Sequence, residues 1–159
     1  AGEGHDQVYT SIDYTLAEDS AMEMVFGDHL ANRLTGNSAG NVLGGGGGAD
    51  VLARLGGSDT FAFRTWLDGT TDTILDFDVK DDSIFLSQLV FEIPMFDGTL
   101  EPGYFHVGSA AEHHLHKIIY NPVTGALLYD PDGTYSGAPI QFATLDPHLN
   151  LTAGNFLVI

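Results

Sequence analysis

The residues of this chain best suited to chemistry are aspartates and asparagines that recur every nine positions beside glycines. Asn32, Asn41, Asp50 and Asp59 follow one another at this interval. Their side chains, together with the carbonyl groups that glycine turns leave free, offer oxygen ligands. Calcium is a hard ion that takes roughly six to eight oxygens in a flexible geometry. The spacing therefore predicts calcium ions held between glycine turns.

One segment matches a complete nine-residue pattern. Residues 45–53, GGGGADVLA, fit G-G-x-G-x-D-x-U-x at every fixed position, where U is a large apolar residue. The next unit keeps Gly57 and Asp59 but has Arg54 and Leu55 where the pattern has glycines. The repeat is therefore clear in one unit and degenerate in its neighbours, which leaves the number of metal sites open.

The elements that must position these ligands follow from apolar residues at the same interval, Val25, Leu34, Leu43, Leu52 and Phe61. In each unit a glycine-rich stretch of six residues forms a turn with positive φ angles, and three residues form a short strand. Each unit is half a coil whose apolar residue is buried only when units stack. The sequence therefore predicts an all-β fold that begins as a parallel β-roll or β-helix solenoid.

Half-coil units place turns on the same side of the solenoid when they are two repeats apart. Asp50 is thus expected opposite the turn that holds Asn32, and Asp59 opposite the turn that holds Asn41. The predicted metal ligands are Asn32, Asn41, Gly45, Gly46, Gly48, Asp50, Gly57 and Asp59. Asparagine lowers the charge of a site, so we expect on the order of two or three ions with dissociation constants of about 10⁻⁴ to 10⁻³ M.

The nine-residue period ends after Phe63, and the rest of the chain is richer in aromatic and β-branched residues. Turn residues there separate candidate strands. These strands are expected at 73–77, 83–86, 116–120, 127–129 and 140–143. We expect two domains, calcium-binding repeats over 1–63 and a mostly antiparallel β cap over 64–159, which covers the open end of the solenoid.

The acidic composition of the chain limits the kinds of partner that it can bind. The chain has 159 residues, with 5 Lys and Arg against 22 Asp and Glu, for a formal net charge of -17. This charge repels phosphate backbones and anionic membranes, so no nucleic acid partner is expected, and it favours bound cations. No apolar run approaches the roughly 20 residues of a membrane helix, so no membrane insertion is expected. The chain has no cysteine, and its start, without Met or a signal pattern, suggests the interior of a longer protein.

Several segments resemble one known family. They are LTGN at 34–37, GSDTF at 57–61, DTILDF at 72–77, IIY at 118–120, GALLYD at 125–130 and NFLVI at 155–159. With the glycine repeats, they are similar to the RTX, or hemolysin-type, calcium-binding family. The similarity is greatest to the C-terminal regions of serralysin-like proteases and related type I secreted proteins, and it covers nearly the whole chain.

The resemblance implies a secreted, extracellular protein that stays loose in a calcium-poor cytosol and folds on calcium outside the cell. It implies a type I secretion transporter as partner, with an export signal at 155–159, where a plain last strand is the alternative. It also implies an upstream domain in the parent protein and a further calcium ligand, Asp72, acting with Asp59. On this interpretation the chain is not an enzyme by itself.

Two other functions remain open. The chain could be an adhesin or carbohydrate-binding end that uses aromatic residues such as Trp66, Tyr104 and Tyr135. It could also be a fragment of a secreted hydrolase whose catalytic part lies upstream. A longer parent sequence that carries an H-E-x-x-H metalloprotease motif, which this chain lacks, would favour that alternative.

A histidine cluster leaves another alternative open. His113, His114 and His116 could offer imidazoles to zinc or nickel, because alternate residues of a strand share a face. The same residues would equally form a solvated polar edge.

Overall fold

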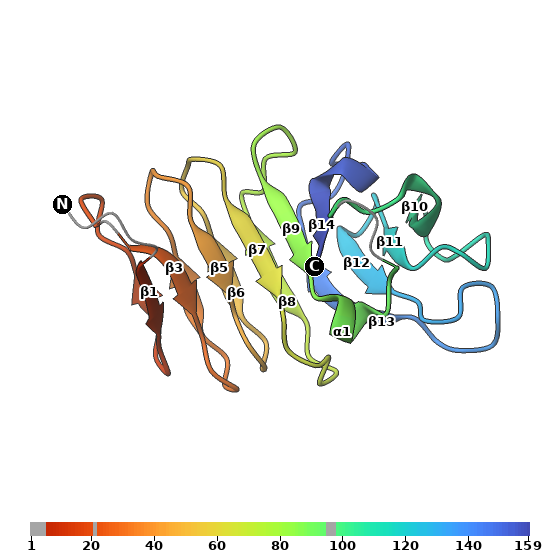
Figure 1. Ribbon diagram of the computed structural model, residues 1–159, viewed down its shortest axis with the longest axis horizontal. Coiled ribbons are helices and arrows are strands. Elements are labelled where there is room, and N and C mark those ends of the chain that lie inside the picture. The colour runs from red at the N-terminus through yellow and green to blue at the C-terminus, as the bar shows by residue number, and fades with distance from the viewer. Residues whose placement is uncertain (1–5, 21, 95–97) are drawn as a thin grey trace.

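The computed structural model describes residues 6–20, 22–94 and 98–159 (Figure 1). It has 34% strand and 7% helix, which makes the protein all-β as predicted. The strands are β1 (Asp6–Tyr9), β2 (Tyr14–Thr15), β3 (Met22–Phe26), β4 (Arg33–Thr35), β5 (Val42–Gly44), β6 (Val51–Ala53), β7 (Thr60–Phe63), β8 (Asp72–Leu75), β9 (Ser83–Leu86), β10 (Phe105–Val107), β11 (Ile118–Tyr120), β12 (Ala126–Tyr129), β13 (Ile140–Thr144) and β14 (Phe156–Val158). The short helices are α1 (Gln88–Phe91), η1 (Pro102–Tyr104) and η2 (Ala153–Asn155).

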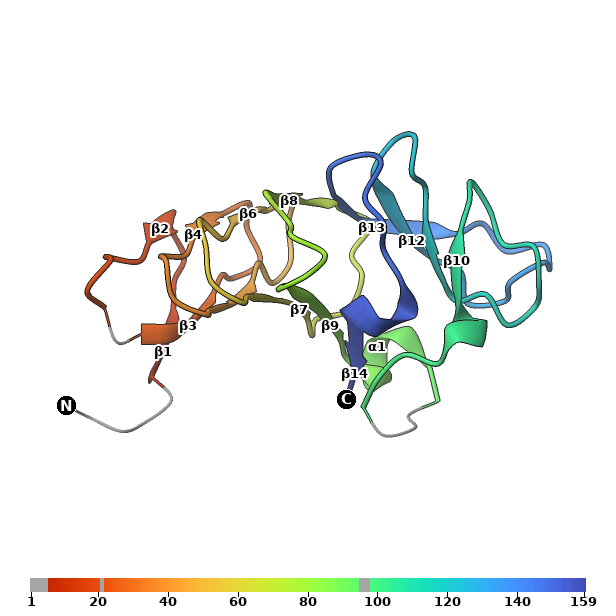
Figure 2. The ribbon, with the colours of Figure 1, turned by 90° about the horizontal axis from the view of Figure 1, so that it is seen from above.

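The strands form two sheets. Sheet A has the order β1-β3-β5-β7-β9-β14, and sheet B has the order β10-β11-β12-β13-β8-β6-β4-β2. From β1 to β9 the chain alternates between the sheets, because each short strand is followed by a turn that crosses to the other layer (Figure 2). All strand pairs of sheet A are parallel.

The core lies between the two layers. In sheet A, pairing in register aligns one inward row, which consists of Val25, Leu43, Phe61, Ile84 and Phe156. All five side chains of this row are buried. Each contributes about 1.5–3 kcal/mol by leaving water. The row shows how stacking buries residues that no single unit could bury.

Sheet B carries the matching inward row. Leu34, Leu52 and Ile74 lie in register on β4, β6 and β8, and all three are buried. Every apolar residue of the predicted nine-residue series is therefore in the core, which confirms that part of the sequence prediction.

Both sheets continue past the point where the sequence period ends. Strands β8 and β9 pair in parallel with β6 and β7. The turns before them, 64–71 and 76–82, are longer than the six-residue turns of the earlier units. The period disappears because the turns lengthen, while the alternation between sheets goes on.

The expectation of a mostly antiparallel C-terminal part is wrong. Among the described residues, β11–β12 and β12–β13 pair antiparallel, as do Thr99 and Leu157 in an isolated bridge, whereas β10 pairs with β11 in parallel. β13 and β14 join β8 and β9 in parallel, because they extend two sheets whose direction is already set. The five expected strands correspond to β8, β9, β11, β12 and β13. Strand β14 corresponds to the plain last strand that was the alternative interpretation of residues 155–159, whereas the sequence did not reveal β10 or the short helix α1.

In the three described stretches, no helix is long and apolar enough to cross a membrane.

Candidate metal centre

The turns stack along two edges of the coil. The first turn edge consists of 27–32, 45–50 and 64–71, which lead from sheet A to sheet B. The second turn edge consists of 36–41, 54–59 and 76–82, which lead from sheet B to sheet A. Nearly all the predicted ligands lie on these edges, and Asp72 begins β8 directly after the last turn of the first edge.

Along the first turn edge, aspartates link successive turns. The main-chain N–H of Asn32 donates to Oδ1 of Asp50 at 2.7 Å, and the N–H of Asp50 donates to Oδ1 of Asp72 at 3.0 Å. All three residues are buried. Asp50 thus lies against the turn of Asn32, as the two-repeat spacing predicted.

The second turn edge repeats this arrangement. The N–H of Asn41 donates to Oδ1 of Asp59 at 2.7 Å, and the N–H of Asp59 donates to Oδ1 of Asp82 at 3.0 Å. The sequence prediction missed Asp82, which is buried like the others. A signal was present, because Asp82 stands two residues before an inward apolar residue, Ile84, as Asp59 stands before Phe61.

Two carboxylate oxygens in this arrangement have no partner. Oδ2 of Asp50 and Oδ2 of Asp59 are fully buried and accept no hydrogen bond, and each residue is only 1% exposed. A buried charge without a partner is costly, so such groups favour a proton or a cation. Burial raises the pKa of Asp50 above its usual range and raises the pKa of Asp59 to about 6.

The next aspartates along the two edges, Asp72 and Asp82, also have raised pKa values. Burial raises the pKa of Asp72 to about 7 and also raises that of Asp82. The exposed Asp68 behaves in the opposite way, because hydrogen bonds from Thr70 and from the N–H of Gly48 lower its pKa to about 2. Both turn edges therefore concentrate carboxylates, and those of Asp50 and Asp59 each keep one buried oxygen without a partner.

Glycine is required where these turns press together. A Cβ at Gly45 would lie 2.1 Å from Oδ2 of Asp50. Gly46 has φ +96°, and a Cβ there would lie 2.0 Å from the carbonyl oxygen of Asp28. The carbonyl oxygen of Asp28 accepts the N–H of Gly47 at 2.8 Å, so the two turns contact each other through their main chains next to the unpaired carboxylate. Carboxylate and carbonyl oxygens are the ligands that calcium takes from protein loops.

The predicted carbonyl ligands do not all face Asp50. The carbonyl oxygens of Gly46 and Gly48 accept from the hydroxyls of Thr65 and Thr70 at 2.7 and 2.6 Å, so they point to the next turn. There Gly46, Gly48 and Asp72 line one small pocket together with Asp68. The structure therefore distributes the predicted ligands over more than one level of the first turn edge. Asp68 was not predicted, and no repeat position marks it.

Leu55 adopts a backbone conformation that the repeat normally assigns to glycine. It stands where the repeat has glycine, its φ is +70°, and its side chain is 60% exposed. A non-glycine residue in this conformation costs about 1 kcal/mol. Leu55→Gly is therefore expected to raise the free energy of unfolding by about 1 kcal/mol in urea titration.

The control for this substitution is Leu55→Ala, which keeps the Cβ and hence the strain. It is expected to leave stability unchanged within about 0.5 kcal/mol. Equal stabilisation by alanine would show that the exposed side chain, and not the backbone conformation, was unfavourable.

The histidines lie at the other end of the molecule. The rings of His106 and His116 stack with centroids 4.5 Å apart, and those of His113 and His114 are 4.2 Å apart. Nδ1 of His116 accepts the N–H of Glu112, and burial lowers the pKa of His116. The rings of His113 and His116 are tilted by 52° with their centroids 5.9 Å apart, so the four rings form one contiguous group.

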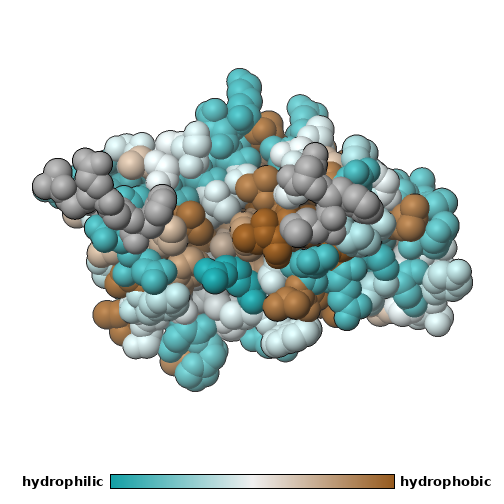
Figure 3. Space-filling model, in the orientation of Figure 1, coloured by the Kyte–Doolittle hydropathy of each residue, from teal (hydrophilic) through white to brown (hydrophobic). Residues whose placement is uncertain are grey.

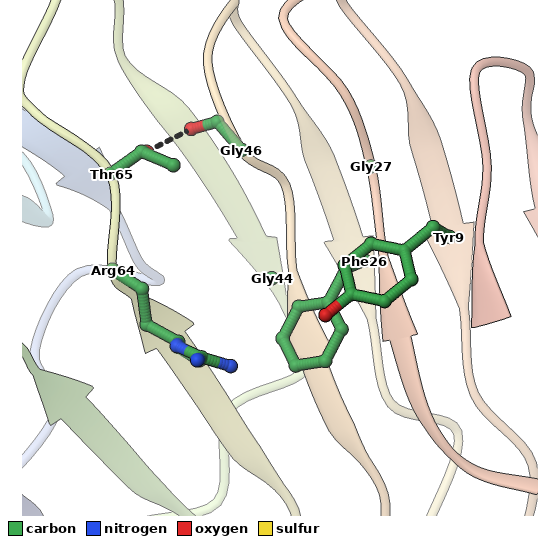
Figure 4. A pocket seen from close by; sticks show the side chains of 8 residues that line it. Tyr9, Phe26, Gly27, Gly44, Gly46, Arg64 and Thr65 are labelled. Atoms are coloured by element: carbon green, nitrogen blue, oxygen red, sulfur yellow. Dashed lines mark hydrogen bonds between the residues drawn. The ribbon is translucent and has the colours of Figure 1, made fainter. Parts of the chain in front are cut away.

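A shallow apolar groove lies on the outer face of sheet A, where apolar side chains gather in Figure 3. It has a volume of about 390 Å³ and adjoins a second hollow of about 280 Å³. Phe26 stacks on Tyr9 at 5.4 Å, and the guanidinium of Arg64 lies 5.2 Å from the centroid of the Phe26 ring (Figure 4). Nothing in the structure shows what covers this groove.

The aromatic residues suggested for glycan binding lie on separate segments. Trp66 and Tyr135 are exposed, on the turn 64–71 and after β12, whereas Tyr104 is partly buried against the core. The C-terminal residues form β14, which pairs in parallel with β9.

No family model matches the chain, and no curated protein matches it. Within the described residues, no three His, Cys, Asp or Glu side chains form a group that could hold a metal ion. A site that draws its ligands chiefly from carbonyl oxygens of glycine turns would not form such a group.

Proposed function

We propose that this chain is a calcium-binding module of the RTX type, a parallel β-roll with a β cap that folds when calcium binds outside the cell. The observation that carries the proposal is the pair of buried, unpartnered carboxylate oxygens of Asp50 and Asp59. Each belongs to a turn in which glycines lie close to main-chain atoms of the neighbouring turn.

Charge supports this choice of ligand. The net charge of -17 opposes folding into a compact state. The linked aspartates of the two turn edges are buried, so their acidic groups lie where water is least accessible. A divalent cation bound there supplies neutralisation of the buried carboxylates. The ligands we propose are those predicted from the sequence, Asn32, Asn41, Gly45, Gly46, Gly48, Asp50, Gly57, Asp59 and Asp72.

Coupling between the cation and folding follows from how the ligands are assembled. Asp50 and Asn32 meet only when two turns of the coil have stacked. An unfolded chain therefore has no formed site, and the free energy of binding contributes directly to folding. In a calcium-poor cytosol the same chain would remain loose.

The wider role rests on the resemblance of the sequence. We propose a secreted protein that leaves the cell through a type I transporter, with the segment 155–159 as part of its export signal. The folded module would then stabilise an upstream domain of the parent protein. Of the alternatives, neither a glycan-binding end nor a hydrolase fragment is favoured by a contact in the structure.

The first experiment is a far-ultraviolet circular dichroism titration of chelator-treated protein with calcium, with magnesium as the control. We expect a cooperative gain of strand signal at roughly 10⁻⁴ to 10⁻³ M calcium. Magnesium should produce no such gain, because it requires a tighter octahedral set of ligands. Full strand content in chelator, unchanged by calcium, would contradict the proposal.

A further inference from the structure

Arg54 occupies the space between two turns of the second edge. Its guanidinium lies 3.1 Å from Oδ2 of Asp82 and 3.9 Å from Oδ2 of Asp78. It also donates to the carbonyl oxygens of Asp76 and, at 3.4 Å, of Gly57. The arginine side chain is only 17% exposed, so the cation is held inside the edge.

The partners of Arg54 are all oxygens, two from carboxylates and two from main-chain carbonyls. They come from both turns, 54–59 and 76–82. Carboxylates and carbonyls in this mixture are the ligands that calcium takes from protein loops. The guanidinium thus lies where a divalent ion would otherwise bridge two turns.

The guanidinium changes the surroundings of the buried aspartate at its own level of the coil. Asp50, Asp59 and Asp82 each accept a main-chain N–H through Oδ1. Oδ2 of Asp50 and of Asp59 has no partner, whereas Oδ2 of Asp82 contacts Arg54 and accepts the N–H of Asp78. The level that contains an internal cation is the one whose inner carboxylate oxygen is satisfied.

The position of Arg54 in the repeat explains how it arrives there. It stands nine residues after Gly45, where the pattern has its first glycine. At Gly45 any side chain would collide with Oδ2 of Asp50. At Arg54 the long side chain instead crosses to the following turn and reaches Asp82.

We propose that Arg54 is a built-in substitute for a calcium ion at the level of Asp82, and that its removal uncovers a calcium site made by Gly57, Asp76, Asp78 and Asp82. That the uncovered site would take calcium rests on the proposed function, whereas its occupation by the guanidinium does not. This level of the coil therefore needs no metal, and the guanidinium holds it together where the turn 76–82 departs from the six-residue length of the repeat.

The test counts calcium ions per chain by equilibrium dialysis, with calcium chloride at millimolar concentration and metal analysis of both compartments. Arg54→Ala is expected to bind one ion more than the wild-type chain. Arg54→Gly, which restores the glycine of the repeat, is measured beside it. If the alanine Cβ clashes in the turn, the glycine variant still reports the effect of removing the guanidinium. The control is Arg33→Ala, which removes an exposed arginine from β4.

The outcomes separate this inference from the proposed function. An additional ion in the Arg54 variants, absent in Arg33→Ala, supports the inference even if the wild-type chain binds none, a result that would sink the proposed function alone. An unchanged count in both Arg54 variants overturns the inference, whether or not the wild type binds calcium. An equal gain in Arg33→Ala also overturns it, because overall charge would then explain the effect. Variants that unfold in chelator and do not refold with calcium overturn it as well.

Discussion

Replacing Asp50 and Asp59 together by asparagine is expected to stabilise the calcium-free chain and to remove most of its response to calcium. Asparagine keeps the oxygen that accepts from the N–H of Asn32 or Asn41. It removes the buried charge on Oδ2, which has no partner. The replacement leaves a neutral unpaired N–H₂ group, whose cost is about 1–3 kcal/mol, whereas an unpaired charge costs more.

The double variant is expected to fold better without calcium but to bind calcium more weakly, and a general loss of stability would not produce both changes. In chelator at pH 8, the double variant should show at least as much strand signal by circular dichroism as the wild type. The calcium concentration at half-maximal strand signal should rise about tenfold or more, because two ligand charges are lost.

The matched control is Asp146→Asn, which removes one exposed charge away from both turn edges. It should alter neither quantity beyond the effect of net charge. A double variant that unfolds more easily in chelator while its calcium midpoint stays the same would show that the carboxylates serve only as hydrogen-bond acceptors.

The stability of the calcium-free protein is expected to fall as the pH rises from about 4 to about 7. Aspartate in the unfolded chain titrates near 3.8, whereas burial raises the pKa of Asp72 to about 7 and of Asp59 to about 6. Between these values the folded state holds more protons than the unfolded chain, so each rise in pH favours unfolding. The stabilising contribution is complete below about pH 4 and lost above about pH 7.

The size of the effect follows from the two values. Each pKa unit corresponds to about 1.4 kcal/mol, so the change from pH 5 to pH 8 is on the order of 4 kcal/mol. This is a large part of the 5–15 kcal/mol that usually separates folded and unfolded states. The strand signal in chelator across this range, expressed as the fraction of folded chain at each pH, would measure it.

Calcium should abolish or reverse the slope, because the metal binds deprotonated carboxylates. Below about pH 4 the trend in chelator should also reverse, since Asp68, whose pKa lies at about 2, then loses its favourable hydrogen bonds on protonation. A calcium-free protein that becomes more stable from pH 5 to pH 8 would contradict the electrostatic account of the turn edges.

The sequence predicted the part of the fold in which one local rule repeats. Val25, Leu34, Leu43, Leu52 and Phe61 are all in the core because strand and turn lengths are constant over that stretch. The same rule predicted which turns meet, and hence the contact of Asp50 with Asn32. Periodicity predicts contacts only between units of equal length.

Where the turns lengthen, the rule no longer locates residues. Asp82 has the role of Asp59 but stands at a different interval, so only its place before Ile84 marked it. Asp68 depends on the path of the turn 64–71, which no local pattern specifies. Arg54 was recognised only as a departure from the motif, because three of its four partners lie on the turn 76–82, more than twenty residues away.

The pairing of β14 with β9 has a consequence for the rate of folding. Phe156 lies in register with Ile84 and completes the inward row of sheet A. Contacts so distant in sequence require closure of a long loop before they stabilise anything, which raises contact order and slows folding. The early units can stack by contacts between residues close in sequence, whereas β14 docks on β9 only after the long intervening segment has closed. Folding of the module is therefore expected to proceed from the repeats to the cap, with the docking of β14 as a late and slow step.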